Sequence, residues 1–121
     1  MAAEALGTFI IIGGGCGSVC ALKYTGMAAS PIAAPLAFGA AVTMAIYTTR
    51  DVSGAHLNPA ISLSLAVNKP EAFPARQLLP YCVAQMIGAT VGGFANYFLF
   101  SHGIKALEKA SGVVRGAKGS E

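Results

Sequence analysis

Long uncharged tracts alternate along the chain with short stretches that carry the charges. Residues 5–22, 24–49 and 77–101 contain no Asp, Glu, Lys or Arg, which makes uncharged runs of 18, 26 and 25 residues. A helix rises about 1.5 Å per residue, so about 20 residues cross the roughly 30 Å hydrocarbon core of a bilayer. Pro31 and Pro35 place the start of the second helix inside its tract. The pattern predicts three membrane-spanning helices, over about residues 4–24, 33–50 and 77–100.

A fourth apolar stretch, residues 52–67, is too short to cross a membrane. Gly54, His56, Asn58 and Pro59 interrupt it, so only about residues 58–67 can be helical, which gives about 15 Å of helix. Asn58 is a favoured N-cap residue, and Pro59 suits the first helical position. Such a segment is a re-entrant half-helix, an interfacial helix or a buried helix of a soluble protein. A re-entrant segment would be a candidate pore wall, because non-helical backbone in lipid must be buried in protein or line a wet cavity.

Small residues recur at helical spacing in each predicted span. Such rows let helix backbones approach closely in lipid, where no hydrophobic force drives helices together. They are Gly13 and Gly17 in the first span, Ala37, Ala41 and Ala45 in the second, and Ala84, Gly88 and Gly92 in the third. We therefore expect the three helices to pack closely.

The composition excludes several classes of protein. Hydrophobic residues make up 55% of the chain and charged residues 11%, whereas soluble domains are about 25% charged. This balance argues against a soluble enzyme and a disordered chain, and favours an integral, multi-pass membrane protein. The net charge of +3 is too small and dispersed to indicate nucleic-acid binding. The first span carries Glu4 and lacks the basic segment and cleavage site of a secretory signal peptide.

The strongest case for an enzyme is the glycine-rich run at residues 8–18, which imitates a strand entering a dinucleotide-binding turn. No G-x-G-x-x-G is completed there, and no acidic residue follows about 20 positions later. Cys16 and Cys20 lie one helical turn apart and Cys82 is alone, which gives no zinc-binding spacing. We expect no enzyme activity, cofactor or metal, and a dinucleotide-binding enzyme is only a remote alternative.

Residues 53–60, Ser-Gly-Ala-His-Leu-Asn-Pro-Ala, resemble the first signature loop of the aquaporin and glycerol-facilitator family, the major intrinsic proteins. The family's hallmark is Asn-Pro-Ala opening a half-membrane helix. Residues 3–8 resemble its first helix, residues 45–47 the end of its second, and Gln85 with Gly88 and Ala89 its third.

The resemblance implies an all-α membrane protein with three transmembrane helices plus one re-entrant half-helix, which is one aquaporin-like inverted repeat. Residues 1–101 would form this N-terminal repeat, with the half-helix at about residues 58–67. Residues 102–121 would be a polar linker toward a second repeat.

The resemblance also implies roles for single residues in contact with the transported solute. Asn58 would donate its side-chain amide to passing molecules. Gly54, Ala55 and His56 would present backbone carbonyls along one wall. Phe38 falls at the second-helix position of the family's narrow selectivity filter.

Four further residues would support the loop. Pro59 and Ala60 would pack against the matching motif of the other repeat. Glu4 would be buried and hydrogen-bond the loop backbone, and Gln85 would brace the same loop.

Several of these residues also have a purely structural interpretation. Glu4 could be a first-turn acid at the membrane interface, where the helix dipole favours it. The His56 ring is expected to be a structural hydrogen-bonding group. Phe38 could be core or lipid-facing bulk, and Asn58 could act only as a cap.

The implied function is passive transport of water or small neutral solutes such as glycerol, across the plasma membrane and in family-style tetramers. The family pore needs two half-helices meeting at mid-membrane, and these 121 residues hold one Asn-Pro-Ala. We expect the chain to be a piece or a natural half of such a channel, inactive as a lone monomer. The alternative is a non-conducting membrane assembly or remnant protein.

Overall fold

The computed structural model describes residues 1–25, 30 and 32–113, and within them every regular element is a helix. The elements are α1 Ala2–Ile10, the π-helix η1 Ile11–Cys16, α2 Gly17–Tyr24, α3 Ala33–Ser53, α4 Pro59–Asn68, the short 3-10 helix η2 Ala75–Gln77, α5 Leu78–Leu99 and α6 Ser101–Ser111. The predicted all-α class is confirmed.

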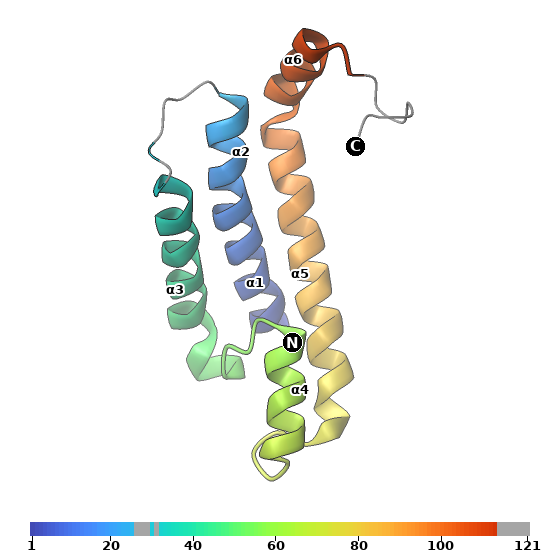
Figure 1. The fold of residues 1–121 in the computed structure, drawn as a ribbon. Helices are drawn as coiled ribbons and strands as arrows, with labels where there is room; N and C mark the ends of the chain where they lie inside the picture. Colours follow the sequence, from blue (N-terminus) through green and yellow to red (C-terminus); the bar gives the residue numbers. More distant parts are fainter. Residues whose placement is uncertain (26–29, 31, 114–121) are drawn as a thin grey trace.

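One continuous helix of 23 residues forms the centre of the molecule. It comprises α1, η1 and α2, and it lies between α3 and α5, contacting both (Figure 1). The short α4 begins near the N-terminal end of α1 and packs against the first part of α5 (Figure 1). The loop between α3 and α4 therefore reaches the first turns of α1.

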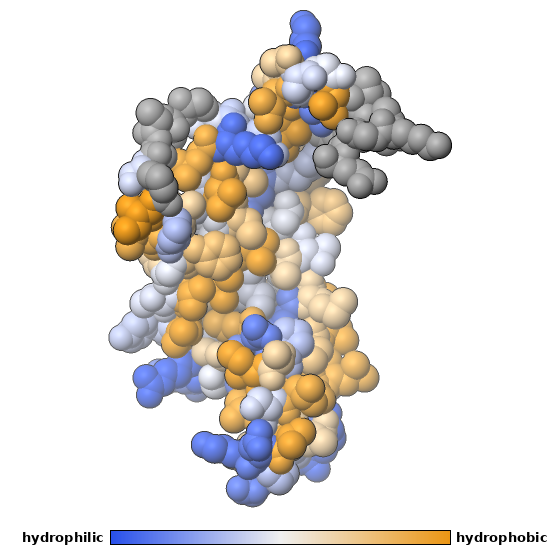
Figure 2. All heavy atoms as spheres, viewed as in Figure 1, coloured by the Kyte–Doolittle hydropathy of each residue, from blue (hydrophilic) through white to orange (hydrophobic). Residues whose placement is uncertain are grey.

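Two of the long helices are both long and apolar enough to cross a membrane, Ala2–Tyr24 and Ala75–Leu99. Helix α3 has 21 residues, but its C-terminal half carries three threonines, Arg50 and Asp51 and is less apolar. Its crossing of the membrane therefore stays a prediction. On the face seen in Figure 2, hydrophobic residues cover much of the middle of the bundle, and hydrophilic residues gather mainly toward its two ends.

Glycines bring the backbone of α5 against that of α1. A Cβ atom added at Gly88 would clash with the carbonyl oxygen of Ala5, and one at Gly92 would lie 3.1 Å from the carbonyl oxygen of Phe9. Ala84, also buried, continues the same row one turn earlier. The small-residue row predicted on the third span is thus the surface on which α1 and α5 meet.

The first long helix is not regular in its middle, where the sequence predicted a plain α-helix. Residues Ile11–Cys16 form π-helical turns, and the carbonyl oxygen of Ile12 accepts a hydrogen bond of 2.9 Å from Nδ2 of Asn96 on α5. The wider turns alter which glycines face a neighbour. A Cβ added at Gly17 would lie 2.8 Å from Oδ1 of Asn96, whereas one at Gly13 would meet nothing within 4 Å among the described residues. The sequence predicted that Gly13 and Gly17 both serve close packing. In the structure, close packing requires glycine at position 17 but not at position 13.

Helix α6 occupies part of the segment predicted to be a polar linker. It ends at Ser111 and is capped by Gly112, which adopts a left-handed conformation with φ of 67°. A Cβ added at Gly103 would lie 2.5 Å from the carbonyl oxygen of Tyr24, so α6 packs against the end of α2. Residues 114–121 of that predicted linker lie outside the described residues.

Candidate functional site

The loop that follows α3 reverses the chain through three left-handed residues. Gly54 caps α3 with φ of 83°, and Ala55 and Leu57 have φ of 50° and 53°. Glycine adopts this conformation without strain, but each of the two other residues costs about 1–2 kcal/mol. The loop therefore needs an external partner to hold its shape.

The carboxylate of Glu4 is that partner. Its Oε1 atom accepts hydrogen bonds from Ser53 Oγ at 2.6 Å and from the His56 backbone N–H at 3.0 Å. Its Oε2 atom accepts from the Leu57 backbone N–H at 2.7 Å and from Gln85 Nε2 at 2.8 Å. Glu4 is fully buried, and four donors fill the positions that a carboxylate offers.

These bonds are strong enough to hold the loop in its left-handed conformation. A hydrogen bond to a charged group contributes about 1.5–3 kcal/mol net, so the bonds from His56 and Leu57 offset the strain at Ala55 and Leu57. Gly7 supports the arrangement, because a Cβ added there would clash with the Leu57 side chain. The first turns of α1 thus fix a loop about 50 residues further along the chain.

A second layer of polar contacts lies behind the loop. Ser62 Oγ on α4 lies 3.1 Å from His56 Nδ1 and accepts a hydrogen bond of 3.1 Å from Gln85 Nε2. The His56 ring is buried and packs against Phe73 and Tyr81, with ring centroids 4.6 and 4.9 Å away. The ring therefore has structural contacts, and Gln85 reaches the loop through Glu4 and Ser62 rather than through the loop backbone.

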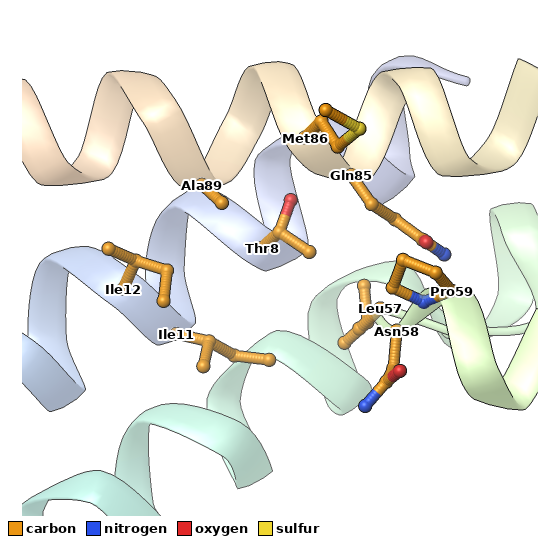
Figure 3. Close-up of a pocket in the computed structure, with 9 residues that line it drawn as sticks. All are labelled: Thr8, Ile11, Ile12, Leu57, Asn58, Pro59, Gln85, Met86 and Ala89. Atoms are coloured by element: carbon orange, nitrogen blue, oxygen red, sulfur yellow. The ribbon is translucent and has the colours of Figure 1, made fainter.

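Asn58 starts α4 as its N-cap, with Pro59 at the first helical position. Its Oδ1 atom accepts a hydrogen bond of 2.8 Å from the Ala60 backbone N–H. Its Nδ2 atom has no hydrogen-bond partner in the described part of the chain, and Figure 3 shows it pointing away from α4. Capping uses only the oxygen, so the amide N–H groups stay available to another hydrogen-bond acceptor.

Two hollows meet at Asn58 and Leu57. One, of about 290 Å³, is lined by Ile11, Phe38, Val42, Ile46, Ala55, His56, Leu57, Asn58 and Ile61. The other, of about 260 Å³, is shown in Figure 3 and is lined by Thr8, Ile11, Ile12, Leu57, Asn58, Pro59, Gln85, Met86 and Ala89. Most of the residues that line the two hollows are apolar, and Asn58 contributes a polar side chain to both.

The structure brings most of the sequence-predicted site residues to these hollows. Phe38 on α3 lines the first hollow together with Ala55, His56 and Asn58. Gly54 is exposed and lines neither hollow, although it shapes the loop. The remaining predicted residues are Pro59, which lines the second hollow, Ala60, which is exposed, and Glu4 and Gln85, which lie beneath the loop.

Three residues of the site escaped the sequence reasoning. Ser53 and Ser62 take part in the buried network, and the Tyr81 hydroxyl donates a hydrogen bond of 2.9 Å to the Ser53 carbonyl oxygen. Ser62 stands one helical turn after Asn58, and Tyr81 one turn before Gln85. This helical spacing is the sequence signal from which Ser62 and Tyr81 could have been predicted as part of the site.

Among the described residues, no group of three His, Cys, Asp or Glu side chains could hold a metal ion.

A comparison with protein families agrees with this geometry. Residues 1–118 match the family described as major intrinsic protein. The chain belongs to the major intrinsic protein family. Its all-α architecture is accordingly that of one aquaporin-like repeat, in a family of integral membrane channels.

Named relatives within the major intrinsic proteins cover nearly the whole chain. Propanediol uptake facilitator PduF of Citrobacter freundii is 38% identical over 115 residues, which is 95% of this chain and 42% of that protein. Aquaporin Z of Bradyrhizobium diazoefficiens is 42% identical over 101 residues, which is 83% of this chain and 41% of that protein. Glycerol uptake facilitator protein of Pseudomonas aeruginosa is 40% identical over 118 residues, which is 98% of this chain and 42% of that protein. The chain thus spans about two fifths of the length of these relatives.

The Glu4 network predicts a stability effect in this major intrinsic protein. Replacing Glu4→Gln turns one oxygen into an NH₂ group that faces hydrogen-bond donors, so we expect the free energy of unfolding to fall by about 2 kcal/mol or more. Glu71→Gln is the control, because Glu71 is exposed in the turn after α4 and should change stability by less than about 0.5 kcal/mol. Denaturant titration in detergent micelles, followed by circular dichroism, measures both. Equal unfolding midpoints for the two variants would contradict the role of Glu4.

Proposed function

We propose that this chain supplies half of the pore of a membrane channel that passes water and small neutral polyols. The observation that carries the proposal is the Asn58 side chain: its oxygen caps α4 while its amide nitrogen has no partner in the described part of the chain. The amide stands at a hollow that Phe38 also lines. It can donate to a hydroxylic solute without weakening the cap.

The α4 dipole supports selection for neutral molecules. A helix N-terminus carries about half a positive charge, which repels cations and orients an uncharged dipole. This use of half-helix dipoles is the established account of aquaporin-type pores. The lining residues of the two hollows include no acidic side chain, and the nearby Glu4 carboxylate lies beneath the loop with its oxygens bonded to loop N–H groups and to Ser53 and Gln85.

The two walls of the first hollow suit a hydroxylic solute. The loop at Ala55, His56 and Asn58 supplies backbone carbonyl groups and an amide, which can replace hydrogen bonds lost from water. The other lining side chains are apolar and hold the solute only weakly; they are Ile11, Phe38, Val42, Ile46 and Ile61. The relatives named for water, glycerol and propanediol support this class of solute.

A second, matching repeat completes the pore in this proposal. Pro59 and Ala60 are exposed and would pack against the matching Asn-Pro-Ala motif. In the assembled protein, α3 crosses the membrane as the second of the three spans, and residues 102–121 lead toward the second repeat. We place the assembly in the plasma membrane, as a homotetramer of the kind the family resemblance implies.

Osmotic flux in proteoliposomes tests the proposed function. We expect the 121-residue chain alone to leave water and glycerol permeability at the level of protein-free vesicles. Co-reconstitution with the C-terminal half of the glycerol uptake facilitator of Pseudomonas aeruginosa should raise permeability, and that half alone is the control. Flux through the lone, monomeric chain would contradict the need for a second half. A folded pair without flux would favour a non-conducting assembly protein.

A single substitution separates the solute contact of Asn58 from its role as a cap. Asn58→Asp keeps an oxygen for the Ala60 N–H and is an equally good N-cap, but it removes the amide donor. We expect the flux of the co-reconstituted channel to fall by at least about tenfold, with stability almost unchanged. Asn68→Asp makes the same chemical change at the exposed end of α4 and should leave flux intact. Equal flux in the two variants would show that Asn58 is only a cap.

A further inference from the structure

The π-helix η1 lies in close contact with the ring of Phe38 on α3. A Cβ atom added at Gly15 would lie 2.6, 2.7 and 2.8 Å from three ring carbons of Phe38, and real Cβ contacts are essentially never shorter than 3.0 Å. Gly15 is buried, whereas Phe38 is only partly buried. The Phe38 ring therefore rests directly on the backbone of η1.

The same ring lines the hollow at Asn58, and Gly15 does not. Any side chain at position 15 must displace the ring, and the hollow is the open space next to it. The position of the ring, and with it the width of the hollow, thus depends on the absence of a side chain at position 15.

The other glycines of this region do not share the contact. A Cβ added at Gly13 or Gly39 would meet nothing within 4 Å in the part of the chain that the structure describes. One at Gly14 would approach Ala41, which does not line the hollow. Gly13 and Gly39 are therefore matched controls, one in the same π-helix and one beside Phe38 in sequence.

Helix α5 holds η1 in place against α3. Nδ2 of Asn96 bonds the Ile12 carbonyl oxygen within η1, and its Oδ1 atom lies against Gly17. The Phe38 ring thus packs on Gly15 in η1, and η1 is in turn bonded to the buried side chain of Asn96 on α5. Interiors packed this densely transmit a displacement rather than absorb it.

We propose that Gly15 is a positioning residue for Phe38 and thereby determines which neutral solutes enter the hollow at Asn58. The inference rests on the proposed function, because it concerns the selectivity of that same pore. Gly15 itself contacts no solute and acts through the Phe38 ring. A methyl group at position 15 moves the ring into the hollow and excludes glycerol more strongly than water.

Permeability ratios in the co-reconstituted channel test this inference. We expect Gly15→Ala to lower the ratio of glycerol to water permeability by about tenfold, the smaller end of what one methyl group discriminates in an apolar pocket. Gly13→Ala and Gly39→Ala should leave the ratio unchanged. Combining Gly15→Ala with Phe38→Leu should return the ratio to that of Phe38→Leu alone, which a merely structural role of Gly15 would not produce.

A second measurement uses the 121-residue chain alone and needs no flux. With 4-fluorophenylalanine incorporated, the fluorine resonance that disappears in Phe38→Leu is that of Phe38. We expect Gly15→Ala to shift this resonance and Gly13→Ala to leave it in place. If Gly15→Ala does not fold, the double variant with Phe38→Leu should recover folding, because removing the ring makes room for the methyl group.

The outcomes separate the two proposals. A wild-type assembly that passes no solute overturns the proposed function and with it the claim about selectivity. A conducting wild type in which Gly15→Ala and Gly13→Ala have the same permeability ratio overturns the inference alone. An unshifted Phe38 resonance in Gly15→Ala also overturns it, as does a double variant that fails to fold where Phe38→Leu folds.

Discussion

The buried carboxylate of Glu4 is the interaction on which the rest of the site depends. Inside a membrane protein, backbone N–H groups that lie outside a helix need hydrogen-bond partners within the protein, because lipid supplies none. Glu4 gives partners to His56 and Leu57, and it also receives Ser53 and Gln85. The loop is then fixed, so α4 begins at a fixed point and Asn58 presents its amide at the hollow.

The small residues of the bundle make this network possible. Gly88 lets α5 approach the carbonyl of Ala5, which brings Gln85 within reach of Glu4. Gly7 leaves room for the Leu57 side chain on the opposite side of α1. A larger residue at either position would separate the elements that Glu4 connects. The close packing therefore brings the hydrogen-bond donors to Glu4. Because these donors stabilise the carboxylate, a chain with few charged residues can keep a buried acid.

Local patterns predicted the helices and the start of α4, because these depend on residues close in sequence. Asn58 and Pro59 mark a helix start wherever they stand. The π-helix was not predicted in this way, and the residues that contact it, Asn96 and Phe38, are far away in sequence. The family resemblance indicated Glu4 and Gln85. The spacing of Ser62 from Asn58 puts Ser62 on one side of α4 with Asn58, but it does not reveal that Ser62 joins Gln85 to His56.

Amide hydrogen exchange in lipid bilayers tests most directly whether Glu4 holds the loop. The N–H groups of His56 and Leu57 bond the buried carboxylate, whereas that of Ala55 has only a long contact of 3.4 Å to Ser53 Oγ. We predict that His56 and Leu57 exchange much more slowly than Ala55, although all three lie in one non-helical loop. Exchange at the same rate for all three amides would contradict the account.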